Sequence, residues 1–294
     1  MQLLHKHRSP LWTPRRVPAE PVEIDWNHPL AGGMIGCYVP GSYYQLSDLT
    51  GIGPDLVANV NGAVATTPEG YGYSCNTGNA LASSTTMPVE WQLTTGGTLF
   101  WRGICTGNAS SGIDLLIWGN LQNSGFIPDG STSPTFCYAI KIDTTTLLSF
   151  GYAAGTTRNT VFANSSYGVQ TGFVTSVAAT WTVGGAIAVY AWGGGTQGQI
   201  SPTINTGTWS GAAPDYSQSP EPAIGCDPAT GVTNSSGTIT LSAYLYNRPL
   251  TAPQIVTLDS EPFCMLRPVM RSRRIGNFVA PPGYRRWNRT YLIR

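Results

Sequence analysis

Side chains able to do acid–base or nucleophilic chemistry are few in this sequence of 294 residues, and they lie far apart. All three histidines, His5, His7 and His28, precede the main body of the chain. A Ser-His-Asp or Cys-His nucleophilic site inside that body therefore has no histidine available. A zinc site with histidine ligands lacks its ligands for the same reason, so neither class of site is expected.

Paired carboxylates, the groups that hydrolyse glycosidic bonds, are also poorly represented. Retaining enzymes of this kind hold two carboxyl groups about 5–5.5 Å apart. Glu23 and Asp25 form a close pair, but position 28 holds His28 where a third acid would extend the pattern. Asp114 and Asp143 lie on separate predicted strands or turns and are the remaining pair that can meet. The sequence predicts no catalytic residues and no enzyme activity.

The cysteines do not have the spacing of metal ligands, because no two of the six are close together in the sequence. The basic N-terminus is not followed by the apolar stretch of a secretory signal. We therefore expect reduced, buried thiols, with no metal and no cofactor. The six residues are Cys37, Cys75, Cys105, Cys137, Cys226 and Cys264.

A sugar-binding site is a function that the remaining residue types allow. Such a site needs an exposed aromatic ring with polar groups beside it, and some sites add a Ca²⁺ ion held by oxygen ligands. Near predicted loops, Trp192, Trp209 and Tyr216 supply rings and Asp227 supplies an oxygen ligand. We predict these four as candidate glycan-binding residues. The alternative for a tryptophan in a β-sandwich is a place in the core.

The elements that position these residues are predicted to be β-strands. Charged residues make up 11% of the chain, against about 25% in ordinary globular proteins. About a dozen short apolar stretches alternate with turn-forming residues, which favours two packed sheets over βαβ units. Residues 251–254 form a capping box with Pro253 in the first turn, which predicts one short helix ending near Asp259. No stretch approaches the roughly 18 apolar residues of a membrane span.

Charge divides the chain into three predicted parts: an N-terminal arm of residues 1–25, a sandwich of residues 26–260 and a C-terminal tail of residues 261–294. Residues 1–24 hold four basic and two acidic residues, a net charge of +2. Residues 25–260 hold four basic and twelve acidic residues, a net charge of −8. The tail holds eight arginines and one glutamate, a net charge of +7. Prolines keep the N-terminal arm extended.

Both arms are predicted to dock onto an acidic surface of neighbouring subunits, because apolar and aromatic side chains interleave with their arginines. The alternative is that they wrap the body of their own chain. Nucleic acid is the less favoured partner, since no recognition motif accompanies the arginines. The predicted docking residues are Arg15, Arg16, Arg267, Arg271, Arg273, Arg274, Arg285, Arg286, Trp287 and Arg289.

Two stretches resemble the concanavalin A-like (laminin-G-like) jelly-roll superfamily. Residues 173–193 look like its paired strands joined by a glycine turn, and residues 239–251 (ITLSAYLYNRPLT) look like its last strand, corner and closing helix. Members encoded by tailed bacteriophages often continue, as here, through residues 261–268 (EPFCMLRP) into an arginine-rich tail. The resemblance covers roughly residues 26–265 and implies a virion structural protein.

We therefore expect an all-β, two-sheet antiparallel jelly-roll β-sandwich, concanavalin A-like, with extended N- and C-terminal arms and one short closing helix. The resemblance implies a non-enzymatic accessory or decoration protein fastened to the major capsid (shell) protein, or to other virion proteins, of a phage head. We expect a homo-oligomer in the virion, made in the host cytoplasm, with no membrane partner. The alternative function is a glycan-binding adhesion module, or a tail or fibre component for host attachment.

Overall fold

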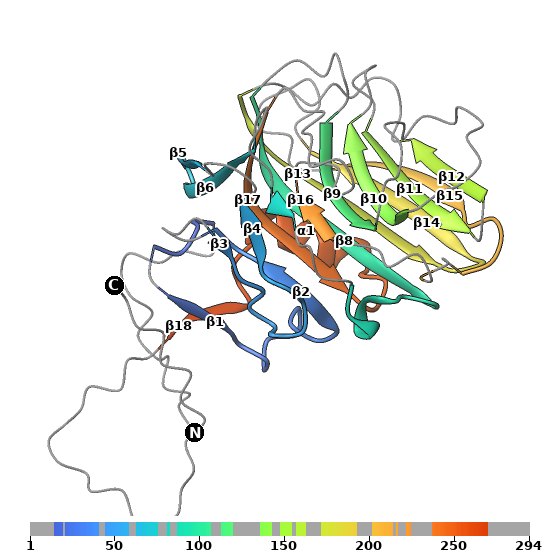
Figure 1. Ribbon diagram of the computed structural model, residues 1–294, viewed down its shortest axis with the longest axis horizontal. Coiled ribbons are helices and arrows are strands. Elements are labelled where there is room, and N and C mark those ends of the chain that lie inside the picture. The colour runs from blue at the N-terminus through green and yellow to red at the C-terminus, as the bar shows by residue number, and fades with distance from the viewer. Residues whose placement is uncertain are drawn as a thin grey trace, which may run out of the picture.

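In the computed structural model, the described residues form an all-β sandwich of two antiparallel sheets with one α-helix (Figure 1). The prediction of a two-sheet sandwich with a single short helix is thus confirmed. The structure describes residues 15–19, 21–40, 45–58, 63–75, 81–82, 87–106, 113–119, 136–142, 148–154, 157–162, 172–192, 202–213, 216, 222–224 and 237–269.

The first sheet has the strand order β12-β11-β10-β9-β16-β7-β4-β3. The second, here called the β8 sheet, has the order β15-β14-β13-β8-β17-β6-β5, and β2 also pairs with β17. The strands of the first sheet are β3 (Gln45–Leu46), β4 (Leu56–Ala58), β7 (Leu81–Ala82), β9 (Ile113–Gly119), β10 (Phe136–Ile142), β11 (Leu148–Ala154), β12 (Thr157–Phe162) and β16 (Pro222–Ile224). Those of the β8 sheet are β2 (Met34–Tyr38), β5 (Ala63–Thr67), β6 (Gly70–Cys75), β8 (Gly96–Cys105), β13 (Val174–Thr182), β14 (Ala186–Ala191), β15 (Thr203–Thr208) and β17 (Thr238–Tyr246).

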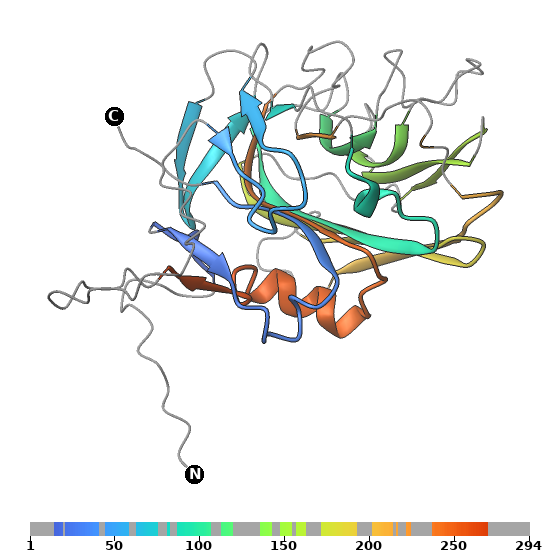
Figure 2. The same ribbon diagram turned by 60° about the horizontal axis from the view of Figure 1, so that its bottom comes forward.

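The β8 sheet is buried on both faces, which explains why β8 and β13 read as nearly continuous buried runs. On β13, Val177 and Trp181 face the first sheet, while Ala178 between them belongs to a second hydrophobic cluster on the outer face. Helix α1 (Ala252–Ser260) covers that outer face with Ile255 and Leu258 (Figure 2). The molecule therefore has a third layer outside the sandwich proper.

Helix α1 begins as the capping box predicts. The backbone N–H of Thr251 donates a hydrogen bond to Gln254 Oε1 at 2.9 Å, which satisfies a donor at the start of the helix. The helix ends at Ser260, and Pro262 follows two residues later. A short 3₁₀ helix, η1 (Val89–Trp91), is the other helical turn in the described part of the chain.

The segments next to the predicted arm boundaries pack with the sandwich. Phe263 and Met265 are fully buried in the outer cluster, together with Val17 from the N-terminal side. Strands β1 (Val22–Ile24) and β18 (Leu266–Pro268) pair with each other as a separate two-stranded sheet (Figure 1). The division into arms and sandwich at residues 25 and 260 stays a prediction. Parts of both predicted arms nevertheless pack with the sandwich or pair as strands.

Candidate functional site

The two-stranded sheet of β1 and β18 brings together segments from near the two ends of the described chain. Glu23 of β1 lies opposite Arg267 of β18, although 244 residues separate them in sequence. The backbone N–H of Val269 donates to the carbonyl of Pro21 at 2.9 Å, so the segments before β1 and after β18 run side by side. Both predicted arms therefore meet the body at a single junction.

A charged cluster lies on this junction. Arg267 donates from Nε to Glu23 Oε1 at 2.8 Å, and its Nη1 lies 3.7 Å from Asp25 Oδ1. The three side chains are between one-third and one-half exposed. Among the residues that the structure describes, Glu23 Oε2, Asp25 Oδ2 and Arg267 Nη2 have no hydrogen-bond partner. Two carboxylates share one guanidinium, so the cluster carries a net negative charge.

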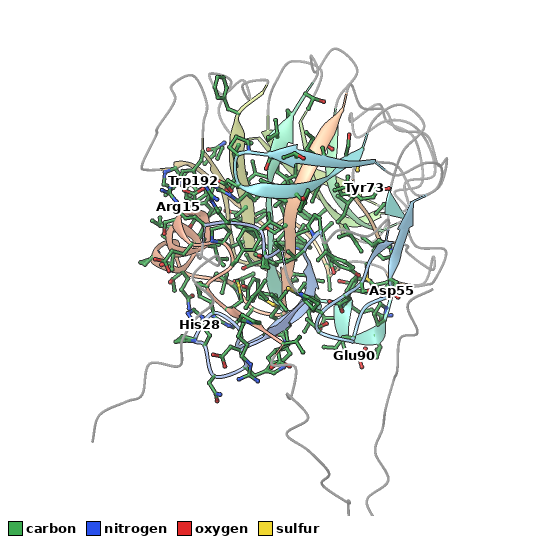
Figure 3. The ribbon with its side chains drawn as sticks, turned by 90° about the vertical axis from the view of Figure 1, so that its left-hand side faces the viewer. Arg15, His28, Asp55, Tyr73, Glu90 and Trp192 are labelled. Carbon is green, nitrogen blue, oxygen red and sulfur yellow. The ribbon has the colours of Figure 1, made fainter. Side chains whose placement is uncertain are left out.

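Trp26 follows Asp25 directly in the chain, and its side chain is open to solvent. It is 55% exposed, whereas the other tryptophan side chains that the structure describes are buried. Its turn is held by hydrogen bonds from His28 N to the Asp25 carbonyl at 2.8 Å and from Ala31 N to the His28 carbonyl at 2.9 Å. His28, on the same turn, lies at the lower end of the body in Figure 3.

The far end of this turn is fixed to the β8 sheet. Gly33 adopts a φ of +80°, which favours glycine, and its carbonyl accepts a hydrogen bond from Asn247 N at 2.9 Å. Arg248 Nε donates to the carbonyl of Gly32 at 2.8 Å. An exposed ring on a turn anchored at both ends needs little reordering to meet a ligand. We call Glu23, Asp25, Trp26, Asn27 and Arg267 the Trp26 platform.

The predicted glycan-binding tryptophans lie elsewhere and are buried. Trp192 is 4% exposed in the outer cluster, and Trp209 is 3% exposed in the core between the sheets. Trp209 stacks on Tyr152 with ring centroids 3.7 Å apart. Neither ring offers an open face for a sugar, because the third layer and the sandwich core cover them. Trp192 and Trp209 therefore have the structural role that was the alternative to sugar binding, which is packing in a hydrophobic core.

The other two candidates give no sugar contact either. Tyr216 is partly buried against the core, and its hydroxyl donates to the carbonyl of Leu93 at 3.0 Å. Asp227 lies outside the described residues. Trp26 is an exposed aromatic residue that the sequence did not lead us to predict. Its position between two polar residues, Asp25 and Asn27, in a turn-forming segment could have indicated its exposure.

The predicted docking residues are described only in part. Arg15 and Arg16 are exposed, and Arg267 is already paired with carboxylates of this chain. The remaining predicted docking residues, which lie outside the described part, are Arg271, Arg273, Arg274, Arg285, Arg286, Trp287 and Arg289.

A second charged network is buried under helix α1. Arg102 of β8 donates to both oxygens of Glu69 at 2.6 and 2.8 Å, to Asp259 Oδ1 at 2.9 Å and to Ser176 Oγ at 2.6 Å. Burial lowers the pKa of Arg102, but the hydrogen bonds and charges of Glu69 and Asp259 outweigh it, so the net pKa is raised. The guanidinium stays charged and ties together β8, β13, α1 and the β5–β6 turn.

This network also contacts the segment of residues 15–19. Val17 N donates to the carbonyl of Glu69 at 2.7 Å, and the Val17 side chain lies against Gly70. Figure 3 places Arg15 on the same side of the molecule as Trp192. Residues 15–18 therefore run over the outer face of the β8 sheet.

The described residues bring together few groups able to do chemistry. They contain no cluster of three or more histidine, cysteine or acidic side chains that would hold a metal ion. Asp114 lies opposite Lys141 in the register of β9 and β10, and Asp143 is outside the described part. Burial raises the pKa of the Cys105 thiol to about 12, so it is protonated at neutral pH.

No described helix is long and apolar enough to cross a membrane.

Comparisons with known proteins concern the fold. No protein-family model and no curated protein sequence matches this chain. The binding domain of Paraclostridial mosquitocidal protein 1 is similar in structure, with a TM-score of 0.55 at 10% identity over 78% of this chain and 52% of that one. The binding domain of botulinum neurotoxin DC in complex with SialylT gives a TM-score of 0.55 at 12% identity, over 79% and 52% of the two chains.

A Trypanosoma rangeli sialidase in complex with 2,3-difluoro-KDN gives a TM-score of 0.51 at 18% identity, over 77% of this chain and 32% of that one. This chain thus spans about half the length of the toxin binding domains and about a third of the sialidase. At such low identity the likeness shows a shared β-sandwich fold and no more. The concanavalin A-like phage family stays a prediction.

Proposed function

We propose that this chain is a carbohydrate-binding module without catalytic activity, and that it holds a glycan on the Trp26 platform. The observation that carries the proposal is the exposed Trp26 side chain, on an anchored turn that directly follows the strand bearing Glu23 and the residue Asp25, which both contact Arg267. A sugar ring presents an apolar C–H face that stacks on an aromatic ring, while its hydroxyls need fixed polar partners.

The fold supports the same function. One similar toxin binding domain is named in complex with SialylT, which is a property of that protein and of a chain about twice as long. A binding role rather than a reaction is supported by the described side chains. His28 Nδ1 accepts a hydrogen bond from Leu30 N at 3.2 Å instead of activating a nucleophile, and the Cys105 thiol is buried and protonated.

A virion role through the arms is the second candidate. The side-by-side course of Pro21 and Val269 and the exposure of Arg15 and Arg16 favour it, because one junction presents both arms to one partner. The partner would be an acidic surface of the major capsid protein or another virion protein, bound by a homo-oligomer of this chain. None of the solved structures named above is a phage protein, so the phage head, virion location and capsid partner are proposals.

Binding of the full chain to a glycan array tests the carbohydrate-binding function. We expect saturable binding that falls roughly tenfold or more in Trp26→Ala, because the stacking surface is removed. Trp26→Phe keeps a ring and should retain part of the binding.

Phe173→Ala is the matched control. It also removes an exposed aromatic ring, 40% exposed, but immediately before β13, where Val174 pairs with Ile104 of β8. Wild-type chain that binds no glycan would refute the function. Glycan binding that is unchanged in Trp26→Ala would refute the location.

A further inference from the structure

We infer that the Trp26 platform selects neutral pyranose sugars with two adjacent free hydroxyls and discriminates against sugars that carry a carboxylate or a sulfate. The inference rests on the proposed carbohydrate-binding function and adds the chemical class of the ligand.

The first argument is the charge of the platform. Glu23 and Asp25 contribute two carboxylates, and the single guanidinium of Arg267 already contacts both. His28, on the same turn, accepts a hydrogen bond from Leu30 N at its Nδ1, so this ring nitrogen is engaged by the backbone of its own turn. An anionic sugar group placed here meets a net negative charge, so it is repelled rather than paired.

Among the described residues, no other arginine or lysine is placed to neutralise the net negative charge of the platform. Arg248, at the far end of the turn, donates to the Gly32 carbonyl at 2.8 Å and lies 3.4 Å from Gln254 Oε1. Its guanidinium is directed toward the backbone and helix α1. The exposed arginines Arg15 and Arg16 belong to the segment that runs over the outer face of the β8 sheet, next to Glu69 and Val17.

The second argument is the kind of hydrogen bond that the platform leaves open. Glu23 Oε2 and Asp25 Oδ2 accept only, whereas Arg267 Nη2 donates only. A hydroxyl both donates and accepts, so adjacent hydroxyls can donate to the carboxylate oxygens and accept from the guanidinium. A carboxylate or sulfate group of a sugar accepts only, and it leaves Glu23 and Asp25 without a donor.

The third argument is the position of the ring. Asn27 N donates to Asp25 Oδ1 at 3.3 Å, which fixes the carboxylate on the residue before Trp26. Asp25 N donates to the Met265 carbonyl at 2.8 Å, which fixes the backbone of the same residue to the chain entering β18. Trp26 and the acceptor-bearing Asp25 are thus consecutive residues of one anchored segment, which suits a ligand with one apolar face and one hydroxyl-bearing edge.

The test measures the affinity of the full chain for matched glycans that end in a neutral hexose or in the corresponding uronic acid, sialic acid or sulfated sugar. We expect neutral ligands to bind at least about tenfold more tightly than their charged counterparts. Glu23→Gln and Asp25→Asn keep the oxygens that accept from Arg267 Nε and Asn27 N but remove negative charge. Each substitution should reduce the ratio of the affinity for neutral ligands to the affinity for charged ligands. The double variant should reduce this ratio most.

The outcomes separate the inference from the function on which it rests. Charged glycans that bind more tightly than neutral ones, with loss in Trp26→Ala, would overturn the inference and leave the carbohydrate-binding function standing. A chain that binds neither class would overturn both. Neutral binding that is nearly constant between about 50 and 500 mM salt agrees with the inference, since uncharged ligands are not screened. A steep fall over that range counts against it.

Discussion

Replacing Arg102 by methionine tests whether the buried charged network holds the third layer onto the β8 sheet. The substitution keeps much of the aliphatic volume but removes four hydrogen bonds, two to Glu69 and one each to Asp259 and Ser176. It also leaves two carboxylates, each 19% exposed, without their cation.

The expected cost follows from that burial. Breaking a buried ion pair by removing one partner destabilises a protein by about 3–5 kcal/mol. The value for Arg102→Met should lie near the lower end, because the carboxylates of Glu69 and Asp259 keep some contact with water. Arg267→Met is the matched control, since its side chain is 49% exposed and an exposed pair contributes about 0–1 kcal/mol.

Urea unfolding at pH 7 measures both variants against the wild type. We expect a lower transition midpoint for Arg102→Met with an unchanged dependence on denaturant, and almost no change for Arg267→Met. Combining Arg102→Met with Glu69→Gln and Asp259→Asn should recover part of the loss, because the orphaned charges are removed. If Arg102→Met costs no more than Arg267→Met, the network is not what holds the third layer, and the reasoning fails.

Two further predictions concern the thiols and the tail. Burial raises the pKa of Cys105 from 9.0 to about 12, so the folded chain holds this proton over a range in which the unfolded chain loses it. The contribution of Cys105 to the free energy of unfolding should therefore be constant below pH 9 and fall by up to about 1.4 kcal/mol per pH unit above it, in addition to the contributions of the other buried thiol and tyrosines whose pKa values are raised. Urea unfolding from pH 8 to 11 measures the slope, and an equal slope in Cys105→Ala would contradict the assignment. Removing residues 270–294 should leave circular dichroism and melting temperature nearly unchanged, because β18 remains. The proposed virion role further predicts that this truncation abolishes co-sedimentation with virions. An unfolded product, or normal incorporation, would refute this division of roles.

The strands and the helix could be predicted from the sequence because their signals are local. The capping box at residues 251–254 and the strand–glycine turn–strand pattern of residues 173–193 depend only on neighbouring residues, and the structure has α1, β13 and β14 there. The two-sheet architecture follows from the number of short strands between turn residues. Local patterning is therefore enough for the fold class.

The site could not be predicted in the same way, because exposure depends on segments far apart in the chain. Trp26 is open to solvent and directly follows, in the chain, a residue of a charged cluster that exists only because Glu23 pairs with Arg267 across 244 residues. Trp192 and Trp209 sit near loops in the sequence, yet the outer layer and the core between the sheets bury them. Nothing in the sequence states which tryptophans a distant segment will cover.

Burial of both faces of the β8 sheet also limits where this side of the molecule can bind a ligand. Helix α1, residues 261–266 and Val17 occupy the outer face, so Trp192 contributes packing there. A binding surface must then form where turns carry side chains beyond the end of the sheet, as Trp26 does. The Asp25 backbone that bears this turn is hydrogen-bonded to Met265, immediately before β18. The Trp26 platform and the root of the C-terminal tail are therefore one structural unit, and a partner that displaced β18 would also displace the platform.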